Sequence, residues 1–288
     1  MSENFYTTSA SRARALELDT RPVSVLAFGS QLFSGGVGLN AALPVYAGAN
    51  VRCASVPTLL LSNLPHYPSV QTLDIPADWM SRALSDLAAT GALTDLRIVA
   101  VGYLADPAQA FAIAEWFWGI PDADRPLLIL DPTFGDGDVG FYTNPAVVPA
   151  IREALVPLAR IMTPNAFELQ HLVAVSQGCV APAPGDEVPA LATLVRHARS
   201  LMAPQASGVV LTGIRDSTGD AAMIGNVVVT RDGEQGYYLP AVPTQSKGLG
   251  DLFAAALVTA LLADADLPWA VQSAAAHVQQ AILEQQRG

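Results

Sequence analysis

The chain has 288 residues, of which 51% are hydrophobic and only 14% charged, so it is long and apolar enough to bury the core of one large α/β domain. Its 26 acidic residues outnumber its 15 basic ones, and a net charge of −11 excludes binding along a run of nucleic-acid phosphates. Residues 1–22 lack the apolar core of a secretory signal, and the apolar run 252–263 is too short to span a bilayer. We therefore expect a cytoplasmic protein that binds neither nucleic acid nor membranes.

The first 21 residues carry arginines, serines and acidic residues, and we expect a mobile arm there, followed by a single domain over residues 22–288. From residue 23 onward, short apolar runs typical of strands alternate with stretches of helical spacing. The predicted strands are 23–28, 51–56, 96–101, 127–130, 161–162 and 208–211, with a hairpin of 224–230 and 236–239 around Asp232-Gly233. The predicted helices are 39–47, 78–90, 107–118, 147–158, 191–202, 251–262 and 268–285, and one that begins near Ala166.

This alternation predicts an α/β fold with a mostly parallel central sheet and helices on both of its faces. Ligands of such folds bind beyond the carboxyl ends of the strands, so polar residues that follow strands are the first candidates for a site. The glycine- and serine-rich segment 29–38 follows the first strand but lacks the G-x-G-x-x-G order, and the chain has no Walker A sequence. Dinucleotide binding is therefore disfavoured, while Ser30 is well placed to meet a small polar substrate.

Two carboxylates follow the strand 127–130 in the segment Asp131-Pro132-Thr133-Phe134-Gly135-Asp136. Paired acids in a loop over the cleft suit a hydrated Mg²⁺ that carries nucleotide phosphates, because magnesium takes a few carboxylates and keeps several waters. The alternative is a polar turn in which an aspartate caps the backbone. Both interpretations remain open at this point.

The segment 163–168, Thr-Pro-Asn-Ala-Phe-Glu, also follows a short strand. Asn165 and Glu168 have the spacing of a cap on the first turn of a helix, and the alternative is that they reach the metal or its waters. Further along, Thr212 and Gly213 follow the strand 208–211, where they could hold a nucleotide phosphate.

The most informative stretch is Gly248-Leu249-Gly250-Asp251, which opens into an apolar helix. A helix N-terminus presents unpaired N–H groups and a partial positive charge, which suits a phosphate or a developing negative charge. Asp251 could then take the proton of a substrate hydroxyl as a general base. The alternative is a plain turn with an aspartate cap. Lys247, the one lysine of the chain, directly precedes the turn, and its role stays open.

Taken together, the motifs resemble the ribokinase superfamily and, within it, the pyridoxal kinases, over about residues 23–282. Four motifs carry the resemblance, in the order of that family, each at the end of a predicted strand or the start of a helix. They are Ser30…Gly35-Gly36-Val37-Gly38, Asp131-Pro-x-x-Gly135-Asp136, Thr163-Pro-Asn165-x-Phe-Glu168 and Gly248-Leu-Gly250-Asp251-Leu-Phe-Ala-Ala. The resemblance implies a ribokinase-like three-layer α/β/α sandwich.

The resemblance also implies an activity, in which ATP phosphorylates the 5′-hydroxymethyl group of pyridoxal, pyridoxine or pyridoxamine. Asp251 would be the base, with the N–H groups of Gly248, Leu249 and Gly250 stabilising the transferring phosphoryl group. It further implies a Mg²⁺ cofactor and a homodimer, and leaves a requirement for K⁺ open. The implied substrate residues are Ser30, Thr58, Tyr103 and Asp251; the ATP residues are Asp131, Asp136, Thr163, Asn165, Glu168, Thr212 and Gly213; and the metal residues are Asp131, Asp136 and Glu168.

Three departures from the family pattern lie on the substrate side. Gln31 stands where a histidine commonly follows the serine, Leu64-Pro65-His66-Tyr67 replaces His-Thr-x-Tyr, and a tryptophan-containing segment is missing beyond it. Leu249 replaces a usual threonine or valine but would act through its N–H group. Two alternatives therefore stay open: a hydroxymethylpyrimidine kinase, which shares the fold and the catalytic aspartate, and a non-catalytic protein that binds the vitamer.

Overall fold

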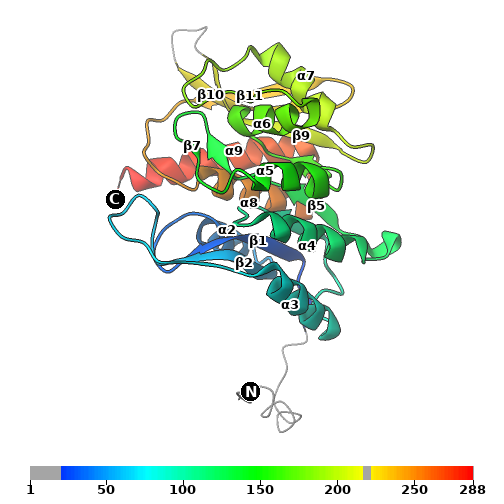
Figure 1. The fold of residues 1–288 in the computed structure, drawn as a ribbon. Helices are drawn as coiled ribbons and strands as arrows, with labels where there is room; N and C mark the ends of the chain where they lie inside the picture. The colour runs from blue at the N-terminus through cyan, green and yellow to red at the C-terminus, as the bar shows by residue number, and fades with distance from the viewer. Residues whose placement is uncertain (1–20, 217–221, 288) are drawn as a thin grey trace.

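The structure, a computed structural model, describes residues 21–216 and 222–287, so all but the last residue of the predicted mobile arm lies outside the described residues. Within them, nine strands form one sheet in the order β11-β10-β9-β8-β5-β4-β1-β2-β3. Figure 1 shows β1 and β2 towards one end of this sheet and β9–β11 at the other. The strands are β1 Val25–Leu32, β2 Cys53–Leu61, β3 Thr72–Asp74, β4 Ile98–Val101, β5 Leu127–Leu130, β8 Ile161–Met162, β9 Gly208–Asp216, β10 Met223–Val229 and β11 Glu234–Pro240.

The six inner strands, from β9 to β2, run parallel, and the outer strands β3, β10 and β11 pair antiparallel. The predicted mostly parallel sheet is therefore confirmed, and so is the predicted hairpin, which is β10 with β11. A second, two-stranded sheet consists of β6 (Gly135–Asp136) and β7 (Gly140–Phe141). It was not predicted, because strands of two residues show no alternation of apolar and polar positions.

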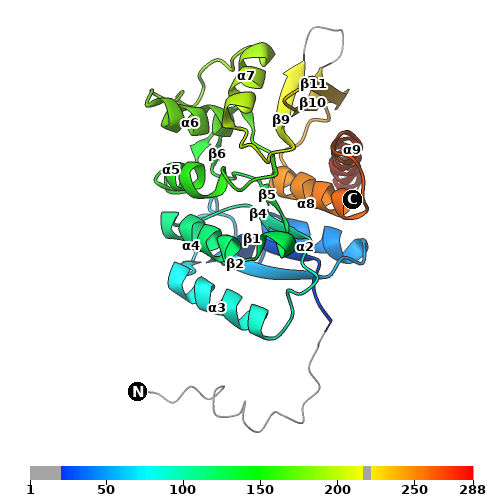
Figure 2. The ribbon, with the colours of Figure 1, turned by 90° about the vertical axis from the view of Figure 1, so that its right-hand side faces the viewer.

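Helices cover both faces of the sheet, and Figure 2 shows the three layers edge-on. One layer contains α2 (Leu39–Gly48), α8 (Leu249–Leu262) and α9 (Leu267–Gln285). The other layer contains α3 Ala77–Ala89, α4 Pro107–Trp118, α5 Val147–Ala150, the π-helical turn Ile151–Leu155, α6 Ala166–Gln177 and α7 Leu191–Leu201, while a short 3₁₀ turn, Asp122–Asp124, precedes β5. This is the three-layer α/β/α sandwich that the resemblance implies.

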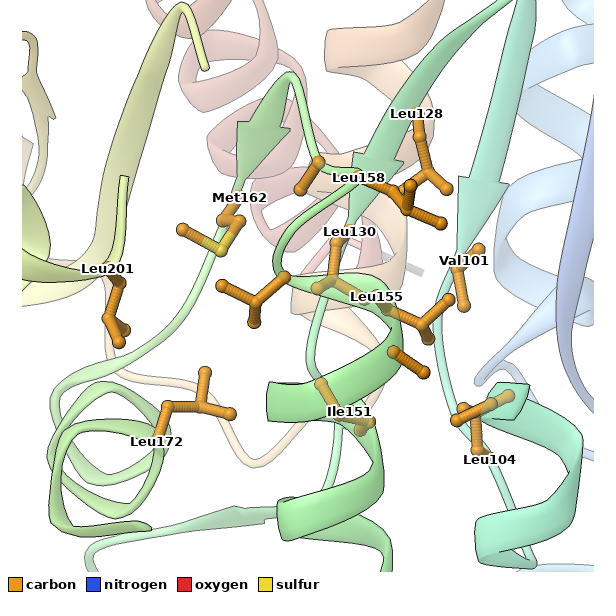
Figure 3. Close-up of a cluster of buried hydrophobic side chains, with 14 of the residues drawn as sticks. Val101, Leu104, Leu128, Leu130, Ile151, Leu155, Leu158, Met162, Leu172 and Leu201 are labelled. Carbon is orange, nitrogen blue, oxygen red and sulfur yellow. The ribbon is translucent and has the colours of Figure 1, made fainter. Parts of the chain in front are cut away.

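The core explains the continuous apolar runs of the inner strands. On β1, Val25 and Ala27 pack against the layer of α2, α8 and α9, whereas Leu26 and Phe28 pack against the opposite layer. Successive side chains of a strand point to opposite faces, so a strand covered on both faces must be apolar throughout. Figure 3 shows part of the hydrophobic cluster between the sheet and the layer that contains α3 to α7. In this cluster, Leu128 and Leu130 of β5 and Met162 of β8 lie near Ile151 and Leu155.

Several strands are longer than predicted, which places expected loop residues inside the sheet. β1 extends to Leu32 and pairs with β2 over its whole length, with an irregularity between Gly29 and Ser30. Ser30 and Thr58 are therefore strand residues. β9 likewise extends to Asp216 and includes Thr212 and Gly213. The sequence rule failed here because the apolar runs end before these residues and because glycine, beside Ser30 and Thr212, is depleted in strands, whereas pairing with a neighbouring strand overrides that preference.

A buried leucine on β5 offers a test of this packing. Leu130→Ala should lower the free energy of unfolding by about 2–5 kcal/mol, because Leu130 is fully buried and its removal leaves a cavity. Leu127→Ala on the same strand, where the side chain is 40% exposed, is the matched control and should cost much less. Urea denaturation measures both changes. Equal losses in the two variants would contradict the assignment of Leu130 to the core.

Candidate active site

The site lies where the carboxyl ends of β1, β4 and β5 meet the start of α8. A cavity there is lined by residues at these strand ends, among them Gly29, Gly102 and Asp131, and by Asp251 of α8. Because parallel strands end at the same edge of the sheet, four segments that are distant in the sequence meet at this point.

Two glycines bring the start of α8 against the loop that precedes α2. Gly248 is the N-cap residue of α8 and has a φ of 81°, which favours glycine. A Cβ atom on Gly248 would lie 2.2 Å from the carbonyl oxygen of Gly36, so no other residue fits without moving the backbone. Gly38 has a φ of 57°, and a Cβ atom there would lie 2.3 Å from both Ser30 oxygens. The two loops are therefore in backbone-to-backbone contact.

Asp251 lies in the first turn of α8, and its Oδ2 accepts a hydrogen bond of 2.8 Å from the Gly38 backbone N. Leu249 and Gly250 precede it in the same turn, where a helix offers no carbonyl partners for their N–H groups. Burial, and then the charge of Asp131, raise the pKa of Asp251 to about 7, against the lowering effect of the hydrogen bond from Gly38. A carboxylate of this pKa can exchange a proton near neutral pH.

Asp131, directly after β5, is held by two hydroxyl groups. Thr163 Oγ1 donates to its Oδ1 at 2.7 Å, and Thr133 Oγ1 donates to its Oδ2 at 2.8 Å. Burial raises the pKa of Asp131 despite these two bonds. Thr163 is itself only 2% exposed, and its hydroxyl positions Asp131. The expected contact of Thr163 with ATP stays a prediction.

Asn165 and Glu168 form a complete capping box at the start of α6. Asn165 Oδ1 accepts from the Glu168 N at 2.9 Å, and Glu168 Oε2 accepts from the Asn165 N at 2.9 Å. Glu168 Oε1 also accepts from the Phe134 N at 3.2 Å, and Asn165 Nδ2 donates to the Gly135 carbonyl at 2.8 Å. The capping alternative therefore describes the geometry, and both residues also fix the segment that leads into β6.

Glu168 is only 4% exposed, and burial together with the charge of Asp131 raises its pKa well above the ordinary value. Asp136 lies apart from this pair, because its Oδ1 accepts from the Asp138 N at 3.0 Å and the Val139 N at 2.8 Å and so closes the turn between β6 and β7. Over the described ranges 21–216 and 222–287, no three acidic, histidine or cysteine side chains form a cluster that could hold a metal. The expected set of Asp131, Asp136 and Glu168 is thus not brought into one protein-only metal site.

On the substrate side, Ser30 is 6% exposed beneath Gly38, and Tyr103 follows β4. Thr58 is fully buried, and its Oγ1 donates to the Tyr103 carbonyl at 2.6 Å. The expected contact of Thr58 with the substrate stays a prediction. Gln109 of α4, also fully buried, supports this arrangement by donating from Nε2 to the Thr58 carbonyl at 2.8 Å. Thr58 and Gln109 therefore position the Tyr103 segment.

Tyr142, after β7, is a site residue that the sequence analysis missed. Its hydroxyl donates to the Gly135 carbonyl at 3.5 Å, beside the segment that follows Asp131. Burial raises the pKa of Tyr142, and so do the charges of Glu168, Asp131, Asp136 and Asp251, in that order. The Tyr103 hydroxyl donates to the Tyr142 carbonyl at 3.5 Å. The aromatic pair Phe141-Tyr142 after a glycine was the available signal.

The nucleotide-side residues Thr212 and Gly213 lie on β9 beside the start of α6. The Thr212 N donates to the Pro164 carbonyl at 3.0 Å, and Thr212 forms a bridge with Asn165. Gly213 is exposed and has a φ of 68°. Thr212 thus adjoins the segment Pro164-Asn165, and the expected nucleotide contacts of Thr212 and Gly213 stay a prediction.

Comparisons with known proteins agree with this geometry. The family model described as phosphomethylpyrimidine kinase matches residues 33–287. A pyridoxine/pyridoxal/pyridoxamine kinase of Bordetella bronchiseptica is 38% identical over 91% of this chain and 89% of its own length. A pyridoxal kinase of Leishmania donovani, solved with ADP and pyridoxine, has a TM-score of 0.78 at 24% identity and covers 91% of this chain and 89% of its own. A Lactobacillus plantarum pyridoxal kinase has a TM-score of 0.77 at 22% identity, with 91% and 88% covered. The resemblance stated from the motifs is confirmed.

The raised pKa of Asp251 predicts how an Asp251→Asn substitution changes stability with pH. The folded pKa of about 7 lies above the ordinary value of 3.8, so the ionised side chain opposes folding. The stability that the protonated Asp251 side chain contributes is fully present below pH 3.8 and is lost as the pH rises through about 7. Asp251→Asn should therefore raise the free energy of unfolding at pH 8 more than at pH 5, as measured by urea denaturation. The same gain at both pH values would refute a raised pKa.

Proposed function

Because the chain belongs to the phosphomethylpyrimidine kinase family, we propose that it is an ATP-dependent kinase that phosphorylates the 5′-hydroxymethyl group of pyridoxal, pyridoxine or pyridoxamine. The observation that carries this proposal is Asp251, a carboxylate of raised pKa placed beside the unpaired N–H groups of a helix N-terminus. The choice of vitamin B6 compounds over a hydroxymethylpyrimidine is supported by the name of the relative at 38% identity.

The reaction follows from this placement. The substrate hydroxyl oxygen forms a bond to the γ-phosphorus of ATP, the bond between that phosphorus and the β–γ bridging oxygen breaks, and ADP leaves. Asp251 accepts the hydroxyl proton, which its pKa of about 7 permits near neutral pH. The N–H groups of Gly248, Leu249 and Gly250 stabilise the negative charge of the phosphoryl group in transfer.

The donor set suits a magnesium ion. The charge of Asp131 raises the pKa of both Glu168 and Asp251 within a buried acidic group, and a dication relieves such repulsion. Magnesium is commonly held by one or two carboxylates together with substrate phosphates, so a protein-only cluster is not needed. When bound, Mg²⁺ would neutralise phosphate charge. Asp131 and Glu168 would face it, and Asp136 would reach it through water.

On the substrate side, Ser30 and Tyr103 would bind the vitamer, with Thr58 and Gln109 holding Tyr103 from behind. On the other side, Thr212 and Gly213 would contact the nucleotide. No helix of the described residues has the length and apolar character needed to cross a membrane. The resemblance further supports a homodimer that acts in the cytoplasm, and it leaves dependence on K⁺ to be measured.

The function is tested by ATP consumption with Mg²⁺ and K⁺ on pyridoxal, pyridoxine, pyridoxamine and hydroxymethylpyrimidine in parallel. Turnover is expected on at least one vitamin B6 compound. Asp251→Asn should lower turnover by at least about 1,000-fold, since it removes the base, while ATP binding measured by calorimetry stays within about twofold. Asp86→Asn, on the exposed face of α3, is the control.

Turnover that survives in Asp251→Asn would exclude Asp251 as the base. Turnover on the pyrimidine alone would assign the chain to hydroxymethylpyrimidine kinases. Binding of a vitamer without any turnover would identify a non-catalytic binding protein.

Glu168 can be tested separately as a charge and as a cap. Glu168→Gln keeps an oxygen that can accept from the Asn165 N, so it preserves the capping box while it removes the charge. We expect it to raise the Mg²⁺ concentration for half-maximal activity several-fold, and Glu168→Ala to do so as well. A rise in Glu168→Ala alone, with an unchanged Mg²⁺ dependence in Glu168→Gln, would leave Glu168 only its capping role.

A further inference from the structure

The cavity of the candidate site extends into the protein, between the sheet and helices α2 and α8. Its volume is about 40 Å³. A buried water requires roughly 10–15 Å³ measured in the same way, so the space is large enough for water. The lining is mostly apolar, with Ala27 and Phe28 of β1, Ala42 of α2 and Ala255 of α8 among its walls. The ionisable side chains that line it are Asp131, Asp251 and Tyr46.

Tyr46 is an unexplained polar residue of this cavity. It lies on α2, is only 2% exposed and lines the cavity. Because a hydroxyl in such a place needs a hydrogen-bond partner, a bridging water is the expected solution where space exists. The proposed reaction gives Tyr46 no role, yet it borders the same cavity as the proposed base.

The charges around the cavity favour the Tyr46 hydroxyl as a hydrogen-bond donor that points towards Asp251. Burial raises the pKa of Tyr46, and the charges of Cys53 of β2 and Asp251 raise it further, so Tyr46 stays a neutral hydrogen-bond donor. Asp251 uses Oδ2 to accept from Gly38. Asp131, at the end of β5, and Tyr142, after β7, also face Asp251, and neither supplies a positive charge.

We propose that one buried water occupies this cavity, accepts a hydrogen bond from the Tyr46 hydroxyl and donates one to the Asp251 carboxylate. Tyr46 is then a positioning residue, which acts on the base from beneath through the water while Gly38 holds it through the other oxygen. The water restricts rotation of the carboxylate and stabilises its ionised form. The inference rests on the proposed function in that it takes Asp251 as the base.

The test compares Tyr46→Phe with Tyr237→Phe. Tyr237 of β11 is the matched control, because its hydroxyl is buried without a partner and it does not line the cavity. We expect Tyr46→Phe to lower kcat about 2- to 10-fold, the range of one neutral hydrogen bond, with the KM values for ATP and vitamer unchanged. The acidic limb of its pH–rate profile should move to higher pH, because the ionised form of Asp251 loses a donor. Tyr237→Phe should change neither quantity.

A second variant covers the case in which Tyr46→Phe does not fold. Ala42→Val extends a side chain of α2 into the cavity, displaces the water and keeps the Tyr46 hydroxyl, and it should lower kcat in the same way. A crystal structure of the wild-type protein should show one water between Tyr46 Oη and Asp251. A dry cavity, or a kcat in Tyr46→Phe equal to that in Tyr237→Phe, would overturn the inference. These outcomes are distinct from a failure of the function, which would appear as a wild-type protein without turnover.

Discussion

One hydrogen bond, from the Gly38 backbone N to Asp251 Oδ2, joins the two halves of this site across 213 positions of the chain. It forms only because the backbone at Gly38 and Gly248 is left-handed and because the loops that contain them touch without side chains between them. The bond fixes the first turn of α8 relative to β1 and α2. The orientation of the helix N-terminus, and with it the direction of its N–H groups, therefore depends on glycines that carry no chemistry of their own.

The second constraint is the cost of keeping three acidic side chains together in a largely buried place. Asp131, Glu168 and Asp251 each have a raised pKa, and burial is the first cause in every case. Hydroxyl and backbone N–H donors compensate part of this cost: two threonines serve Asp131, and the Phe134 and Asn165 N–H groups serve Glu168. A fold optimised for stability alone would place apolar residues here. The arrangement is what a site for a cation and phosphates requires.

The sequence predicted the alternation of strands and helices well, because runs such as 127–130 are apolar at every position and end at a polar residue. It also predicted the Asn165–Glu168 spacing, which is local and fixed by helix geometry. It did not predict the hydrogen bonds of the Thr58 and Thr163 hydroxyls, because composition does not reveal which carbonyl or carboxylate of a distant segment lies beside a hydroxyl. It missed Tyr142 and Gln109 because their roles come from contacts between segments distant in sequence, Tyr103 with Tyr142 and Gln109 with Thr58.

The glycine contact also limits how such a protein can diversify. A methyl group at position 248 or 38 would collide with backbone atoms, so neither position can serve to reshape the pocket by substitution. Other positions have no such restriction: Pro65 is exposed, and Gln31 and Leu64 are partly exposed. These three are among the positions at which this sequence departs from the family pattern. Selection for another substrate would therefore act on positions that tolerate change and leave the glycine contact as an inherited, nearly invariant frame.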